Sequence, residues 1–214
     1  MDHIQKRLFI EYLILFFGAP LLLFITRNIC SPFAILLPFV GIVFIFLHRN
    51  KSFSWSELIQ MKISNRSLRF NVLIVLITGI LLFISVLIFV PDRLFDLPRK
   101  NQKIWLMLCL LYPLVSAFSQ EIVFRTFLFR RYKKLFHRPI YYILASAVCF
   151  SFAHIMYFSW VSVILTFILG LYLSNIYIKT KSVLLTTIIH SVLGIIVFTI
   201  GLGQYFWITI GSNL

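Results

Sequence analysis

The stretch FNVLIVLITGILLFISVLIFV, residues Phe70–Val90, is a run of 21 residues without a charged side chain. A helix rises about 1.5 Å per residue, so a run of this length matches a hydrocarbon core about 30 Å thick. A helix also satisfies all of its backbone hydrogen bonds within one segment, as lipid requires. The stretch therefore predicts a transmembrane helix.

Similar apolar segments recur along the whole chain. Of its 214 residues, 61% are hydrophobic and 12% are charged, and the mean hydropathy is +0.99, whereas soluble domains have about 45–50% apolar and about 25% charged residues. We expect an all-α, polytopic transmembrane helix bundle that forms a single domain over residues 1–214, with about seven spans (six to eight) and an interior polar site. The predicted segments are Leu8–Ile25, Phe33–Leu47, Phe70–Val90, Ile104–Phe129, Ile140–Tyr157, Trp160–Ile178 and Val183–Leu202.

Most basic residues lie in the connections between these segments. Twenty Lys and Arg face six Asp and Glu, a net charge of +14, but no separate basic domain is present, so we expect anionic lipid headgroups as counter-charges and no nucleic-acid partner. With seven spans and the N-terminus inside, the inner connections hold 14 Lys and Arg and the outer ones 5, Arg27 among them. The positive-inside rule then predicts a cytoplasmic N-terminus.

Two further segments have a recognisable pattern. The segment Asn50–Arg69 has a pattern typical of an amphipathic helix on the inner leaflet, either an anchor or a guide for substrate. The pattern consists of Trp55, Leu58, Ile59, Met61, Lys62 and Ile63 with Arg66 and Arg69. The tail Tyr205–Leu214 is long enough to extend the last span along the membrane interface or back into it.

The first segment and the cysteines carry no chemistry of their own. Glu11 and Pro20 interrupt the segment Leu8–Ile25 and no small-x-small cleavage site follows it, so we expect a retained helix and not a signal peptide. The three cysteines are far apart, which excludes a CxxC zinc motif and a disulfide framework. We expect core positions for Cys30, Cys109 and Cys149.

Ionisable residues within the spans are few, and each is costly to bury without a partner. Glu121 and Arg125 are four residues apart, which places them on one helix face and predicts an ion pair. His154 and His190 lie in two other apolar segments, and Glu11 is the remaining clear case. Because a buried imidazole also needs hydrogen-bond partners, we expect Glu121, Arg125 and both histidines to converge in one hydrated pocket.

These residues resemble the motifs of a known family. Gln120-Glu121-x-x-x-Arg125, then Phe150-x-x-x-His154, then His190 are similar to the three motifs of the CPBP family, the CAAX-type and bacteriocin-processing intramembrane proteases, over residues 113–194. The resemblance implies a helical fold in a bacterial or archaeal plasma membrane, a membrane-anchored peptide or protein as substrate, and no cofactor. It also implies peptide-bond hydrolysis by a water that glutamate and histidine activate, without a covalent intermediate.

Two positions depart from the family pattern. The first acid of its usual Glu-Glu pair is Gln120 here, and the asparagine usual four residues after the last histidine is Gly194. Because an amide cannot accept a proton, three explanations stay open: Glu121 acts as the base, the chain is an inactivated variant, or it is a natural pseudo-protease. Candidate donors to a developing oxyanion are Gln120, Asn175 and Ser191.

The hypothesis that follows from these residues is an intramembrane endopeptidase. Glu121 and His154 hold the attacking water, His190 helps to hold the water or the oxyanion, and Arg125 orients Glu121. A zinc site is the second chemical version, because two histidines and a glutamate are also zinc ligands, but no HExxH helix is present and the resemblance implies a metal-free site. The same residues would also suit a proton-coupled transporter or a non-catalytic membrane scaffold.

Overall fold

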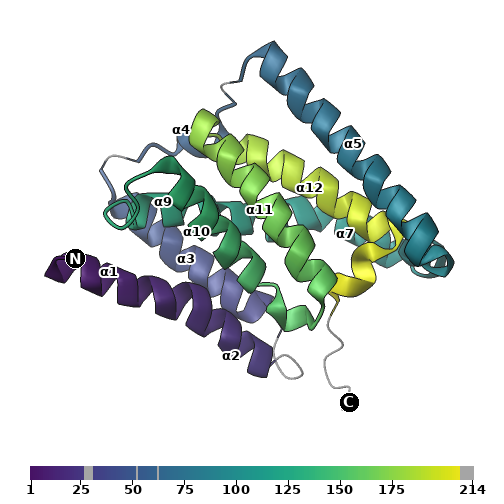
Figure 1. The fold of residues 1–214 in the computed structure, drawn as a ribbon, viewed down its shortest axis with the longest axis horizontal. Coiled ribbons are helices and arrows are strands. Elements are labelled where there is room, and N and C mark those ends of the chain that lie inside the picture. Colours follow the sequence, from purple (N-terminus) through teal and green to yellow (C-terminus); the bar gives the residue numbers. More distant parts are fainter. Residues whose placement is uncertain (27–30, 52, 62, 208–214) are drawn as a thin grey trace.

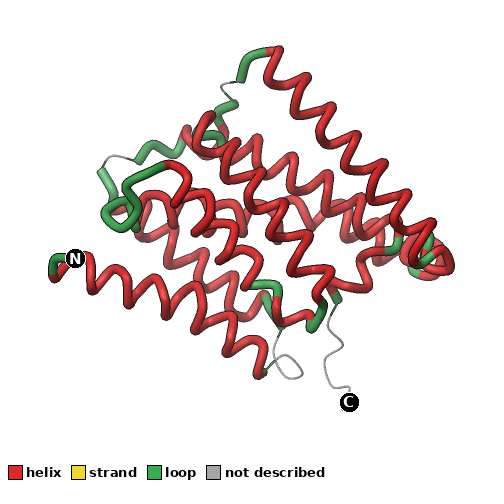
Figure 2. The backbone as a smooth tube through the Cα atoms, in the orientation of Figure 1, coloured by secondary structure: helices red, strands yellow, loops and turns green. Residues whose placement is uncertain are grey.

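The computed structural model describes residues 1–26, 31–51, 53–61 and 63–207. Six of its helical segments are long and apolar enough to cross a membrane, and a shorter apolar helix, α3 (Phe33–Arg49), accompanies them. The described residues contain helices, turns and loops and no strand, as Figure 2 shows. The predicted all-α transmembrane bundle is therefore confirmed. Arg27, Cys30, Lys62 and the last residues of the predicted tail lie outside the described residues.

The helices follow the predicted segments closely. The long segments are His3–Ile25 (α1, His3–Leu13, and α2, Ala19–Ile25), α5 (Asn65–Phe89), Gln102–Arg131 (α7 to α9), α10 (Pro139–Phe152, continued by the turn Ile155–Tyr157), α11 (Trp160–Thr180) and α12 (Val183–Ile200). Short helices or turns cover Ser56–Ile59 (α4), Pro91–Arg93, Asp96–Lys100 (α6) and Leu202–Phe206. Gly201 ends α12 with a φ of 108°, a conformation that glycine adopts without strain.

The helices pack around the motif-bearing segments, which lie at the centre of the bundle. Figure 1 shows α10, α11 and α12 in the middle, α1 and α2 along one edge and α5 along the opposite edge. Buried side chains concentrate on α12 and on the segment Gln102–Arg131, whereas α5 buries only Asn71 and Val86. The exposed apolar surface of α5 is what a lipid-facing helix requires.

A glycine allows α10 and α11 to approach closely. A Cβ atom at Gly170 would lie 2.9 Å from the Cα of Ala147 and 3.3 Å from the ring of Phe150. Near this crossing Ser146 donates a hydrogen bond to the carbonyl of Phe124 at 2.7 Å and accepts one from Ser174 at 3.0 Å. Small side chains and interhelical hydrogen bonds of this kind hold helices together in lipid.

An ion pair joins the N-terminal helix to the end of the α7–α9 segment. Arg131 donates two hydrogen bonds to Glu11, at 2.7 and 2.5 Å, and the hydroxyl of Tyr132 donates a third at 3.1 Å. Burial, with the Glu11 carboxylate beside it, raises the pKa of Tyr132, so its hydroxyl keeps its proton and donates. Glu11 therefore has a structural partner away from both histidines. The thiol of Cys149 is buried against the hydroxyl of Tyr12 at 2.9 Å, and Cys109 is half-buried.

The expected amphipathic helix over Asn50–Arg69 is wrong for most of its length. Within the described residues the helix α4 covers only Ser56–Ile59, and α5 begins at Asn65 behind the N-cap Ser64. Tertiary contacts hold this segment in place: Trp55 stacks on Phe44, Glu57 pairs with Arg130 and the carbonyl of Gln60 accepts a hydrogen bond from Ser182 at 2.7 Å. The apolar side chains of Ile59 and Met61 remain exposed.

Candidate active site

Two π-helical turns flank the first motif. The segment Gln102–Arg131 is α-helical over α7 (Gln102–Leu111), α8 (Ser119–Glu121) and α9 (Leu128–Arg131), with π-helical turns at Tyr112–Phe118 and Ile122–Phe127. Such turns are frequent at functional sites, and a further one lies at Ile14–Gly18 between α1 and α2. Between these turns, Gln120 is half-buried and Glu121 is completely enclosed. These two adjacent residues of the motif therefore lie in different surroundings.

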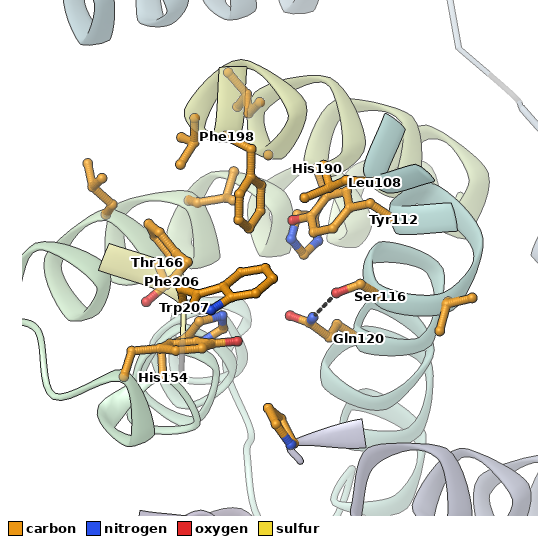
Figure 3. Close-up of a pocket in the computed structure, with 18 of the residues that line it drawn as sticks. Leu108, Tyr112, Ser116, Gln120, His154, Thr166, His190, Phe198, Phe206 and Trp207 are labelled. Atoms are coloured by element: carbon orange, nitrogen blue, oxygen red, sulfur yellow. Dashed lines mark hydrogen bonds between the residues drawn. The ribbon is translucent and has the colours of Figure 1, made fainter. Parts of the chain in front are cut away.

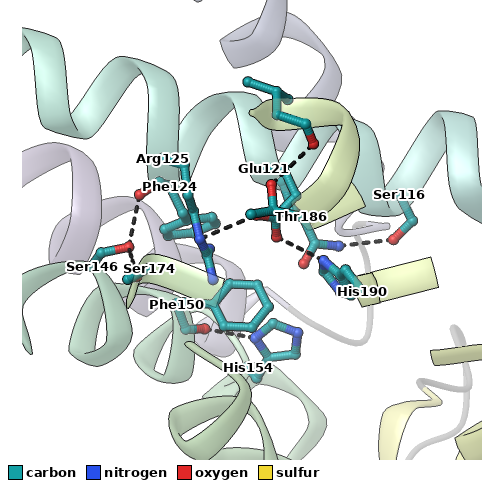
Figure 4. Close-up of polar contacts among 12 residues, drawn as sticks. Ser116, Glu121, Phe124, Arg125, Ser146, Phe150, His154, Ser174, Thr186 and His190 are labelled. Atoms are coloured by element: carbon teal, nitrogen blue, oxygen red, sulfur yellow. Dashed lines mark hydrogen bonds and ion pairs between the residues drawn. The ribbon is translucent and has the colours of Figure 1, made fainter. Parts of the chain in front are cut away.

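Glu121 lies at the centre of a buried charge cluster. Its Oε1 lies 2.9 Å from Nδ1 of His190 and its Oε2 lies 3.2 Å from Nε of Arg125. Glu121 and Arg125 have no exposed surface, so each charge compensates the other away from water. The predicted ion pair is present, and Figure 4 shows Glu121 between its two partners.

Arg125 is held by an aromatic ring as well as by the carboxylate. Its guanidinium carbon lies 4.8 Å from the centre of the Phe150 ring, a cation–π contact that is strongest when the cation is desolvated. Neither Nη1 nor Nη2 has a hydrogen-bond partner among the described residues. The buried positive charge of Arg125 is therefore stabilised mainly by the carboxylate of Glu121 and by the face of the Phe150 ring.

The two histidines lie against the same ring. The centre of the Phe150 ring is 4.9 Å from that of His154 and 5.4 Å from that of His190, both in edge-to-face arrangement. The Nδ1 atom of His154 is 2.7 Å from the carbonyl of Phe150. A carbonyl only accepts, so Nδ1 of His154 donates and its Nε2 keeps a free lone pair. The same holds for a neutral His190, whose Nδ1 faces a carboxylate.

A cavity of about 710 Å³ opens beside these histidines. Most of its wall is apolar and comes from the segment Gln102–Arg131 and from α5, α11 and α12, and Figure 3 shows the polar groups that project into it. Glu121 does not line it, so His190 lies between the carboxylate and the cavity. The polar or ionisable side chains on the wall nearest the motifs are Tyr112, Ser116, Gln120, His154, Tyr157 and His190.

A second, smaller pocket shares several wall residues with this cavity. It measures about 100 Å³ and lies between the N-terminal helices and the π-helical turn after Glu121. Gln120, His154 and Tyr157 border both spaces. One residue of the first motif, Gln120, and one of the second, His154, therefore face both spaces.

The predicted oxyanion donors differ in their placement. Gln120 faces the cavity, where its amide nitrogen donates to Ser116 at 2.8 Å and its oxygen has no partner among the described residues. Ser191 follows His190 on α12, and its buried hydroxyl has no hydrogen-bond partner in the described part of the chain. Asn175 is half-buried on α11 and lines neither pocket.

Tyr112, Ser116 and Phe150 belong to the site although the sequence alone did not assign them to it. A signal existed for two of them, because Tyr112, Ser116 and Gln120 are spaced four residues apart and therefore share one helix face. For Phe150, the sequence showed only that it is the first residue of the second motif. Its contact with Arg125 and both histidines depends on how three segments pack.

Fold and site together define an integral membrane protein of helical bundle type, with an enclosed carboxylate, arginine and histidine cluster beside an apolar cavity. The family model described as type II CAAX prenyl endopeptidase Rce1-like matches residues 102–196. The resemblance to CAAX-type intramembrane proteases is therefore confirmed for the region that carries all three motifs. No curated protein and no solved structure gives a significant match to the chain.

Proposed function

We propose that this protein is an intramembrane endopeptidase that cleaves a membrane-anchored peptide beside the apolar cavity. The observation that carries the proposal is the 2.9 Å contact between Glu121 and Nδ1 of His190, on an imidazole that also lines the cavity. A carboxylate behind a histidine fixes its ring and tautomer and stabilises the imidazolium that forms when the ring accepts a proton.

In this proposal His190 is the general base. Its Nδ1–H donates to Glu121, which leaves Nε2 free to accept a proton from a water in the cavity. His154 offers a second free Nε2, because its own Nδ1 donates to the carbonyl of Phe150. A water that donates one O–H to each ring keeps its lone pairs for attack on the peptide carbonyl, and His190 later returns the proton to the leaving amine.

Arg125 and Gln120 have supporting roles. Arg125 balances the charge of Glu121, so the carboxylate remains ionised in an enclosed site and retains its hydrogen bond to His190. Gln120 lines the cavity but its amide cannot accept a proton. The base function therefore falls to the Glu121–His190 pair, with the carboxylate acting through the imidazole instead of touching the water as the sequence alone suggested.

The cavity suggests the kind of substrate. Its volume of about 710 Å³ and largely apolar wall suit a lipid-modified peptide end, and the matched family model is described as a CAAX prenyl endopeptidase. We therefore propose that the substrate is a peptide whose isoprenoid or similar apolar anchor occupies the cavity. Its scissile bond would then lie beside the side chains of Gln120, His154 and His190.

The test is cleavage of a fluorescent, farnesylated peptide ending in a CAAX tetrapeptide by the purified chain in liposomes, with products identified by mass spectrometry. Glu121→Gln is expected to lower kcat by about 10²–10⁴-fold, and His154→Ala and His190→Ala to abolish turnover. The matched control is Glu57→Gln, which removes a carboxylate that pairs with Arg130 outside the cavity. Wild-type turnover by Glu121→Gln would contradict the proposed mechanism.

A second candidate function is peptide binding without cleavage. One observation favours it: Gln120 is an amide at the position where the CPBP family usually has the first acid of its Glu-Glu pair. It predicts that the wild-type chain binds the farnesylated peptide and leaves it intact. The same cleavage assay, combined with a fluorescence binding measurement, separates the two functions.

A further inference from the structure

Tyr112 occupies the space beside Gly194, one helical turn after His190. A Cβ atom added to Gly194 would collide with Cε1, Cζ and Oη of the Tyr112 side chain. The phenol therefore lies directly on the backbone of α12 at the point where any other residue would project its own side chain. Both residues line the large cavity.

Neighbouring rings fix the position of this phenol. The Tyr112 ring packs edge-to-face with His190 at a centroid distance of 5.9 Å and with Phe198 at 5.8 Å. Two helical turns before Tyr112, the indole of Trp105 donates a hydrogen bond to Thr199 at 2.9 Å, which ties α7 to α12. The hydroxyl is thus held beside the proposed base by two helices, and Figure 3 shows Tyr112 and His190 projecting from adjacent positions.

The Tyr112 hydroxyl is available as a donor in the cavity. Its ring contacts His190 and Phe198, and it donates no hydrogen bond to another described residue, although both imidazoles of the site line the same cavity. A developing oxyanion needs preorganised O–H or N–H donors that point into a site from which water is excluded. A protonated phenol supplies one such donor.

We propose that Tyr112 is a catalytic residue that donates its O–H to the carbonyl oxygen of the scissile peptide. This inference rests on the proposed peptidase function. When the water oxygen bonds to the carbonyl carbon, the π electron pair moves to the carbonyl oxygen, and the phenol stabilises that oxyanion by a hydrogen bond without giving up its proton. The intermediate then expels the amine, which takes its proton from His190.

The position explains why Gly194 has no side chain. The CPBP family usually has an asparagine at this position, and its side-chain amide is also a hydrogen-bond donor. In this chain the phenol of Tyr112, from a different helix, occupies the space beside residue 194. The donor reaches the site from the segment that holds Gln120 and Glu121, instead of from the helix that holds His190.

The experiment compares Tyr112→Phe with the wild-type chain in liposomes. Loss of one oxyanion donor is expected to lower kcat by about 10²–10³-fold and to change KM by less than about threefold, because the donor acts mainly on the transition state. Tyr142→Phe is the control, since its hydroxyl bonds to the carbonyl of Lys133 away from the cavity. Wild-type kcat in Tyr112→Phe would overturn the proposal.

A binding measurement keeps the proposal testable if the peptide is not cleaved. A farnesylated peptide phosphinate, whose P–O⁻ oxygen imitates the oxyanion, is expected to bind Tyr112→Phe at least about tenfold more weakly, while the unmodified farnesylated peptide binds both chains equally. An unchanged phosphinate affinity would overturn the role of Tyr112. Intact peptide with the wild-type chain would contradict the peptidase function alone.

A reciprocal exchange tests the position itself. Gly194→Asn alone collides with Tyr112 and is expected to abolish turnover. Tyr112→Ala combined with Gly194→Asn removes the collision and returns an amide donor to the site, so it is expected to turn over at least about tenfold faster than Tyr112→Ala. Equal rates for these two variants would count against an oxyanion position beside residue 194.

Discussion

The Oε1 atom of Glu121 lies 2.9 Å from Nδ1 of His190, although the two residues are 69 positions apart in the sequence. The contact joins the first motif to the third and gives the carboxylate an indirect path to the cavity. The other carboxylate oxygen of Glu121 pairs with Arg125. The stability of the site therefore depends on the mutual compensation of these two buried charges.

Removal of Glu121 is expected to destabilise the fold as well as stop turnover. Glu121→Ala leaves the fully enclosed Arg125 without its counter-charge, which costs about 3–5 kcal/mol for a buried pair. The double variant Glu121→Gln with Arg125→Met removes both charges and is expected to recover most of this loss. Thermal unfolding of the purified variants in detergent measures the effect. Equal destabilisation by the single and double variants would show that the pair contributes little.

Gln120→Glu is expected to raise the rate of cleavage. The new carboxylate faces the cavity beside Ser116, where it can accept the proton of a water directly. A general base typically accelerates a reaction by about 10²–10⁴-fold. Because His190 already supplies part of this acceleration, we expect Gln120→Glu to raise the rate by about tenfold or less. The initial rate on the farnesylated peptide gives the answer, and a slower Gln120→Glu enzyme would contradict the placement of the water beside this residue.

The close crossing of α10 and α11 is expected to be sensitive to a single methyl group. Gly170→Ala forces its Cβ against the backbone of Ala147, and such overpacking costs about 1–3 kcal/mol. Gly41→Ala is the matched control, because a Cβ there meets nothing within 4 Å and alanine favours a helix by about 0.5–1 kcal/mol. Thermal unfolding of the two variants should therefore shift in opposite directions. A stable Gly170→Ala protein would contradict the crossing geometry.

Glu11 is expected to matter for stability and not for catalysis. Glu11→Gln weakens the two hydrogen bonds from Arg131, and because the pair is partly exposed we expect a loss of about 1 kcal/mol. Turnover per folded molecule should stay within about twofold of the wild type. Parallel melting and kinetic measurements check this, and a large loss of kcat would place Glu11 in the reaction after all.

Chelators are expected to leave cleavage unchanged. Within the described residues no three His, Cys, Asp or Glu side chains are placed to hold one metal ion together, so the proposed mechanism uses protein groups and water only. Cleavage after dialysis against phenanthroline should match that of untreated enzyme. Loss of activity that zinc restores would replace the proposed mechanism by a metal-assisted one.

Composition and spacing were sufficient for the fold class and for much of the site. Long uncharged runs such as Phe70–Val90 determine helices because lipid offers the backbone no other hydrogen-bond partner. The four-residue spacing of Glu121 and Arg125 determines their pairing for a similarly local reason, since helical geometry alone brings these side chains together. The region 113–194 lies within the part of the chain that the family model matches.

Tertiary structure decided what the sequence pattern left open. The sequence alone could not show that His190 separates Glu121 from the cavity, that Phe150 contacts Arg125 and both histidines, or that Tyr112 fills the space beside Gly194. It also led to a wrong expectation for Asn50–Arg69, where the helix α4 covers only Ser56–Ile59 and contacts such as that of Glu57 with Arg130 hold the segment. Periodicity fixes which face of a helix a residue occupies, but the neighbour across that face depends on contacts between segments distant in the chain.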